Sequence, residues 1–286
     1  MPNRFATVLI ASVLSWACVA AQAQPAPGRA DVFEQGSHFV RSYADYSPQW
    51  LIAHWDRDPI CLRIVGLPPE QAAAVKARIQ AVAETAALGE QLTPTVGGAF
   101  SFPSGCRKTK VEIGFTTDPQ KTLDELSAHK GWVPLRGDGT SDTPAPKTVT
   151  RPIQAWYTTY SARDFGPPCK GDLCRSGDPL PRGFDNIVVI VDLRRTGTVI
   201  SGPITDYVAM LVMSQPGSLD RCNTLPSVTD LFACPGRKAP DGLTQADAAF
   251  LRALYTSNDE VYADGQPSVV GERMARILAM TKVAAR

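Results

Sequence analysis

The stretch FDNIVVIVDLRR, residues 184–195, carries the strongest strand signal in the chain. Its centre, Ile187 to Val191, is an unbroken run of β-branched aliphatic residues without polar alternation. Such a run implies that both faces of the strand are buried by other parts of the protein, which is not required of an edge strand. We therefore expect this strand at or near the centre of a sheet, with a further layer on each side.

The next apolar segment, ITDYVAMLVMSQP at residues 204–216, has helical rather than strand spacing. Apolar residues recur at i, i+3, i+4, i+7 and i+8, at Ile204, Tyr207, Val208, Leu211 and Val212, the interval of a buried helical stripe. We expect a helix over 204–214 beneath the sheet. Asp206 lies one position off the stripe and is expected to face solvent or to cap the helix start.

The rest of the chain supplies partners for this strand and helix. Hydrophobic periodicity predicts further strands at 59–67, 110–115 and 153–162, and further helices at 69–88, 118–130, 243–255 and about 267–280. The expected fold is α+β, a mixed sheet with helices packed on it and loops stapled by disulfides. We expect an N-terminal α/β part (24–133), a loop or linker (134–152) and a C-terminal part (153–286), in one continuous domain. Within the first part, no helix or strand is assigned to the polar, proline-bearing residues 24–48.

The balanced composition disfavours a protein that binds its partner through overall charge. Lys and Arg total 29 against 28 Asp and Glu, so no overall field favours nucleic acid or an anionic membrane surface. Neither a P-loop nor a Gly-x-Gly-x-x-Gly fingerprint occurs. We expect no nucleic-acid partner and no cofactor.

The first 23 residues have the pattern of a cleaved signal peptide. Arg4 gives a positive start, an apolar run too short for a comfortable membrane span follows, and Ala21-Gln22-Ala23 forms a small-x-small cleavage site. The expected location is the periplasm or the extracellular medium. No integral membrane segment is expected after cleavage.

Cysteine usage agrees with export. Removing Cys18 with the signal leaves an even set, Cys61, Cys106, Cys169, Cys174, Cys222 and Cys234, which is typical of disulfides in exported chains. Six cysteines allow fifteen pairings, and the sequence does not choose among them. Because short loops are the easiest to close, we favour Cys169–Cys174 and Cys222–Cys234, which leaves Cys61–Cys106.

The C-terminal half carries a family resemblance. The long strand and buried helix are followed by LPSVTDLF (225–232) and LTQADAAFLRALY (243–255). Over residues 150–260 this order resembles matrixin-type zincin metallopeptidases, in which a His-Glu-x-x-His helix precedes a Ser-rich loop and a similar last helix. It is closer to exported α-proteobacterial proteins of the DUF2927 type, which resemble zincins without the metal ligands.

The resemblance places three residues of the 204–214 helix at the zincin catalytic positions. Asp206 and Met210 stand where the two His would be, and Tyr207 stands where the Glu would be. Zinc needs two imidazoles at i and i+4 and a carboxylate as general base, and none of the three roles is filled. We treat Asp206, Tyr207 and Met210 as lining a former cleft, and we expect no metal site and no catalytic residue there.

Two functions from different classes remain open. The first is a non-catalytic zincin-like scaffold, a pseudoenzyme that binds a protein or glycan partner in the cell envelope. The second is a peptidase-like hydrolase with an unrecognised site, using Asp206 and Tyr207 with a carboxylate such as Asp192 or Asp230. Aromatic residues of YADYSPQWLIAHW (43–55) either stack on a glycan or cover the core, and the core interpretation is favoured.

Export gives the first testable prediction. Mass spectrometry of the mature protein from a periplasmic or secreted fraction should find an N-terminus at Gln24, because the small-x-small site ends at Ala23. An intact Met1 in a cytoplasmic fraction would contradict it.

Overall fold

The computed structural model describes residues 29–46, 51–55, 60–87, 110–130, 148–161, 182–257 and 265–284. Four strands form one sheet in the order β1-β2-β4-β3. The strand bounds are β1 Leu62–Val65, β2 Val111–Thr116, β3 Ile153–Ser161 and β4 Arg182–Asp192. β1, β2 and β4 run parallel, and β3 pairs with β4 antiparallel. The sheet is therefore mixed, as predicted, and strands of the N-terminal and C-terminal parts lie in the same sheet.

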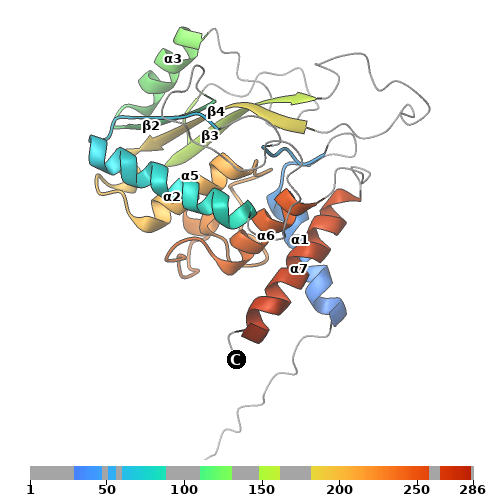
Figure 1. The fold of residues 1–286 in the computed structure, drawn as a ribbon. Coiled ribbons are helices and arrows are strands. Elements are labelled where there is room, and N and C mark those ends of the chain that lie inside the picture. Colours follow the sequence, from blue (N-terminus) through green and yellow to red (C-terminus); the bar gives the residue numbers. More distant parts are fainter. Residues whose placement is uncertain are drawn as a thin grey trace, which may run out of the picture.

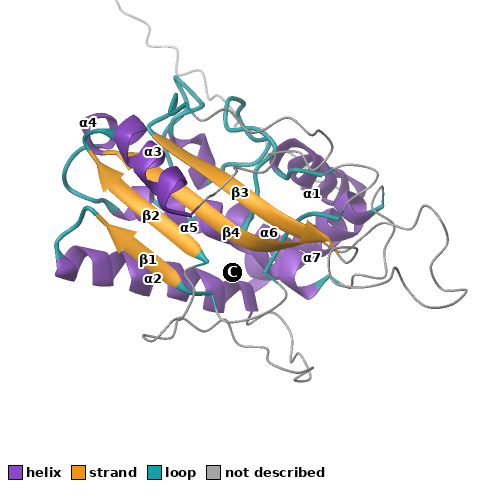
Figure 2. Ribbon diagram, turned by 90° about the horizontal axis from the view of Figure 1, so that it is seen from above, coloured by secondary structure: helices purple, strands orange, loops and turns teal. Residues whose placement is uncertain are grey.

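β4 occupies an inner position of the sheet, which confirms the prediction from its sequence. Ile187, Val189 and Val191 face the main hydrophobic core. Val188 and Ile190 face the other way and form a smaller cluster with Trp156 of β3 and Leu123 of α3. Both faces of the strand are buried because helices lie on both sides of the sheet (Figures 1 and 2).

The helices divide unequally between the two faces. Their bounds are α1 Arg29–Tyr43, α2 Pro69–Ala87, α3 Pro119–Lys130, α4 Leu193–Thr196, α5 Gly202–Met213, α6 Gln245–Thr256 and α7 Gln266–Ala284, with a 3-10 helix, η2, at Val228–Leu231. α3 covers one face, whereas α2, α5 and α6 lie on the other (Figure 1). Within the described ranges, no helix is both long and apolar enough to cross a membrane.

α1 corrects the sequence analysis, which assigned no element to residues 24–48. It packs beside α7, and the helices meet at two glycines (Figure 1). A Cβ added to Gly36 would lie 2.2 Å from the carbonyl oxygen of Gly271, so no larger residue fits between the backbones. Glycine lowers helix propensity by about 1 kcal/mol relative to alanine, which weakens the local signal. The contact with α7, more than 200 positions away, compensates for it.

α5 is buried on all sides, and every residue from Ile204 to Met213 is inaccessible to solvent or nearly so. A helix whose last turn is buried must find partners for its final carbonyl groups. Side chains of three segments donate to them: Trp55 Nε1 to Val212 at 2.8 Å, Tyr157 Oη to Leu211 at 2.9 Å and to Ser214 at 3.2 Å, and Tyr255 Oη to Met213 at 2.7 Å. Aromatic donors thus take the place of water at this helix end.

Tyr43 of α1 completes this arrangement. Its hydroxyl lies 2.8 Å from Ser214 Oγ, and Ser214 Oγ donates to the carbonyl of Met210 at 2.8 Å. Burial raises the pKa of Tyr43 and of Tyr157, so both phenols stay protonated and act as donors. Tyr43 and Trp55 are therefore core residues, as the favoured interpretation had it, whereas Trp50 lies outside the described residues.

Removing one of these donors should destabilise the fold without creating a large cavity. Tyr157→Phe leaves the carbonyls of Leu211 and Ser214 without this donor in a buried site, which costs about 1–3 kcal/mol. Tyr46→Phe is the matched control, because the Tyr46 side chain is only partly buried and packs at the edge of the core. Urea denaturation of both variants measures the difference, and equal midpoints would contradict the capping role.

Candidate functional site

The segment between α5 and α6 is fixed by a disulfide. Cys222 and Cys234 are bonded, with Cα atoms 5.4 Å apart, which confirms this predicted pair. Cys61 is also disulfide-bonded. Its predicted partner Cys106, and the predicted pair Cys169–Cys174, lie outside the described residues, so those pairings stay predictions.

Asp230 organises the interior of the disulfide loop. It is buried, and it accepts from the backbone and side chain of Asn223, from the amide of Ser227 and from Arg237 Nη1 at 3.2 Å. The hydrogen bond that the Ser227 amide donates to Asp230 completes a capping box at the start of η2. The buried carboxylate of Asp230 therefore stabilises the conformation of the loop through these hydrogen bonds.

Asp247 fixes the same loop to the start of α6. One of its oxygens accepts from Ser227 Oγ at 2.6 Å, and the other accepts from the amide of Val228 at 2.8 Å and from the amide and hydroxyl of Thr244. Burial raises the pKa of this carboxyl, and these hydrogen bonds oppose the rise. Thr244 and Asp247 form a capping box at the start of α6. It also joins α6 to the loop, which the sequence spacing alone did not predict.

Asp206 has a different environment from the one expected. It is 3% exposed, so the expectation that it would face solvent or cap the helix start is wrong. Its two oxygens accept from Arg78 of α2, from Nε at 2.5 Å and from Nη2 at 3.0 Å, and one of them accepts the amide of Leu243 at 2.7 Å. Hydrogen bonding to this carboxylate raises the pKa of Arg78.

The difference between the expected exposure of Asp206 and its observed burial has a physical cause. Asp206 points away from the core stripe, but α2 and the 238–244 segment cover that side of α5. A carboxylate between two covering elements has to be paired, and Arg78 together with the Leu243 amide supplies the partners. The partner lies on another helix, 128 positions earlier in the chain, and no local pattern signals it.

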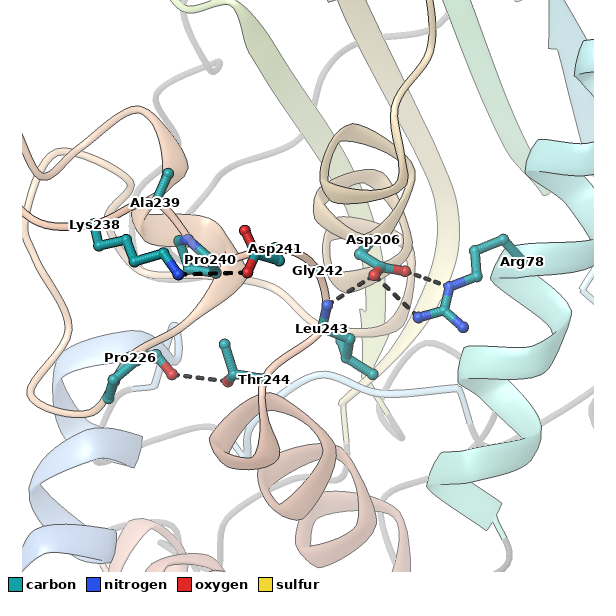
Figure 3. Close-up of a pocket in the computed structure, with 10 residues that line it drawn as sticks. All are labelled: Arg78, Asp206, Pro226, Lys238, Ala239, Pro240, Asp241, Gly242, Leu243 and Thr244. Atoms are coloured by element: carbon teal, nitrogen blue, oxygen red, sulfur yellow. Dashed lines mark hydrogen bonds and ion pairs between the residues drawn. The ribbon is translucent and has the colours of Figure 1, made fainter.

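A pocket of about 530 Å³ opens next to this ion pair. Figure 3 shows Asp206 between Arg78 on one side and the loop before α6 on the other. The lining residues are Arg78, Asp206, Pro226, Lys238, Ala239, Pro240, Asp241, Gly242, Leu243 and Thr244. At the rim, Lys238 and Asp241 form an ion pair at 3.6 Å, with both side chains almost fully exposed. The lining is partly polar and partly apolar, and its two positive and two negative side chains balance.

The other two residues that the resemblance places in a cleft, Tyr207 and Met210, do not line the pocket. Tyr207 is 2% exposed and packs edge-on against Phe232, with ring centroids 5.5 Å apart. Met210 is fully buried in the core. Of Asp206, Tyr207 and Met210, the structure brings only Asp206 to the pocket.

The carboxylates considered for a hydrolase are engaged elsewhere. Asp192, at the end of β4, caps α4 by accepting the Arg194 amide at 3.0 Å and also pairs with the Arg194 side chain. Asp230 belongs to the loop interior described above. Asp192, Asp206 and Asp230 thus each have a separate set of partners.

The described histidines lie apart from the pocket lining. His38 is exposed on α1, and the ring of His54 stands edge-on to Tyr255. Among the residues that the structure describes, no group of three or more His, Cys, Asp or Glu side chains is arranged to hold a metal ion.

Comparison with known proteins adds no identification. No protein-family model, curated protein or solved structure matches this chain.

The contribution of the Arg78–Asp206 pair to stability can be tested by removing each side chain in turn, because Arg78 is half-exposed and Asp206 is buried. Arg78→Ala leaves a buried carboxylate with only the Leu243 amide and should cost about 3–5 kcal/mol. Asp206→Ala leaves a cation that is 46% exposed and can recover water, so the loss should be smaller, about 1–3 kcal/mol. Thermal or urea unfolding of both single variants and of the double variant measures the coupling free energy between Arg78 and Asp206.

The exposed pair Lys121–Glu125 on α3 provides the control. Lys121→Ala should change the free energy of unfolding by less than about 0.5 kcal/mol. If Asp206→Ala were equally neutral, the buried ion pair would have no role in stability.

Proposed function

We propose that this chain is an exported protein of the cell envelope that binds a partner and catalyses no reaction. In this proposal it has the layout of a zincin whose catalytic helix has become a structural one. The observation that carries the proposal is the state of Asp206. At the position of the first zincin His, its carboxylate is held by Arg78 and by the Leu243 amide.

The neighbouring residues support the same proposal. Tyr207, at the position of the general base, is buried against Phe232, and its phenol pKa is raised by burial. A protonated, inaccessible phenol is a poor base for activating water. Met210, at the position of the second His, fills the core instead of facing the pocket. At each of the three positions that the resemblance assigns to zincin roles, the side chain has a packing or pairing role, which supports the proposal.

A partner-binding role is supported by the open polar pocket beside Asp206. Its walls come from α2, from α5 and from the loop before α6, so three segments distant in sequence are brought together there (Figure 3). The Cys222–Cys234 disulfide and the carboxylates of Asp230 and Asp247 hold that loop in place. A pre-formed surface of this kind lowers the entropic cost of binding.

Metal content and hydrolysis test the proposal. Protein purified without chelator should contain no stoichiometric zinc by elemental analysis, and it should cleave neither a peptide library nor a glycoside panel above the rate of Asp206→Asn. This variant is a suitable control because it keeps the size of the side chain and an acceptor for Arg78. Bound zinc, or hydrolysis that Asp206→Asn abolishes, would show that the site is catalytic.

A further inference from the structure

We infer that the pocket beside Asp206 takes a ligand bearing a single carboxylate, and that Arg78 is the residue that recognises it. This inference rests on the proposed function and names the chemical class of its ligand. The observation behind it is the way in which Asp206 fixes the guanidinium of Arg78. The Nε and Nη2 groups both donate to the buried carboxylate, so the plane of the guanidinium is set.

Asp206 does not use the edge of the Arg78 guanidinium that is formed by Nη1 and the second N–H of Nη2. The Nη1 group makes no hydrogen bond to the described residues, the side chain is 46% exposed, and Arg78 lines the pocket. Figure 3 shows the third guanidinium nitrogen directed away from Asp206. A planar guanidinium has two edges with paired parallel N–H groups, Nε with Nη2 and Nη1 with Nη2, and the spacing of each pair matches the two oxygens of a carboxylate. Asp206 takes the first pair, so the Nη1 and Nη2 pair is the one that a ligand carboxylate would contact. Because the plane is already fixed, little side-chain entropy is lost when a ligand binds.

Lys238 is the second group suited to an anion. Its ion pair with Asp241 is almost fully exposed, and such pairs contribute little stability, so the ammonium can exchange this partner for a ligand oxygen. Asp206 and Asp241 also border the pocket. Their charges repel a ligand with several negative groups but tolerate one carboxylate bound by directed hydrogen bonds.

The lining also limits the rest of the ligand. Among the described residues, the lining contains no aromatic ring, and its apolar part consists of Pro226, Ala239, Pro240 and Leu243, so we expect no part of the ligand to be bound by stacking on an aromatic ring. Two sources of the carboxylate fit these conditions, the C-terminus of a peptide and the acid group of a sugar acid. Both offer one carboxylate next to neutral hydrogen-bonding groups.

The test uses pairs of probes that differ only in the acid group. N-acetyl-dialanine is compared with its C-terminal amide, and glucuronic acid is compared with glucose, each titrated at millimolar concentration into the ¹⁵N-labelled full mature protein. The side-chain Nε–H signal of Arg78 and the amide signal of Leu243 report on the site, because both groups donate to Asp206. A carboxylate probe should shift these two signals, and its neutral counterpart should not.

Two variants make the assignment specific. Arg78→Lys keeps the charge beside Asp206 but loses the planar edge, so carboxylate binding should weaken at least about tenfold. Arg63→Lys is the matched control, because Arg63 is also half-exposed and paired with a buried carboxylate, Glu112, but it does not line the pocket. Melting curves confirm that both variants are folded.

The outcomes distinguish a peptide C-terminus from a sugar acid as the source of the carboxylate. They also distinguish the carboxylate inference from the proposed non-catalytic role. Binding of dialanine alone supports a peptide C-terminus, binding of glucuronic acid alone supports a sugar acid, and binding of both supports the carboxylate class. No shift with any probe, equal shifts with the neutral counterparts, or equal weakening by Arg63→Lys overturns the inference. Those results would leave the non-catalytic role untouched, which only bound zinc or hydrolysis overturns.

Discussion

The buried C-terminus of α5 is the constraint on which the rest of the structure depends. Its last turn lies where water cannot reach, so its carbonyls require donors from the protein. Those donors are the Trp55 indole and the Tyr157 and Tyr255 hydroxyls, which come from three separate segments. The hydrogen bonds are directional, so they fix the position of each segment relative to α5 more narrowly than apolar contact would. The sheet, the 51–55 segment and α6 thus meet at one helix end.

The other side of α5 is fixed by charge. Asp206 pairs with Arg78 of α2 and accepts the amide that precedes α6. Burying a carboxylate is costly unless it is paired and hydrogen-bonded, so this contact specifies how α2, α5 and α6 fit together. The same contact shapes the pocket and orients Arg78. If the proposed binding role holds, stability and recognition share this one ion pair.

Local patterns predicted most elements because each pattern reflects local physics. The run Ile187 to Val191 is buried on both faces, as its composition requires, and the short loop between Cys222 and Cys234 is closed by the favoured disulfide. Two predictions failed for the same kind of reason. α1 is stabilised by close packing of Gly36 on Gly271, and Asp206 is buried because Arg78 is present. In both cases the deciding partner is more than 100 positions away in the chain.

The sequence by itself determined the type of most strands and helices and the inner place of β4, and it favoured the Cys222–Cys234 pair, because hydrophobic period and loop length act over short distances. The tertiary structure alone decided which elements meet. It placed Arg78 against Asp206, three aromatic donors at the end of α5 and the 238–244 segment over the pocket. These contacts depend on charge neutralisation and on the satisfaction of buried polar groups. Charge neutralisation and the pairing of buried polar groups become necessary only when folding has removed water from these groups. Local sequence patterns therefore do not predict which residues will pair.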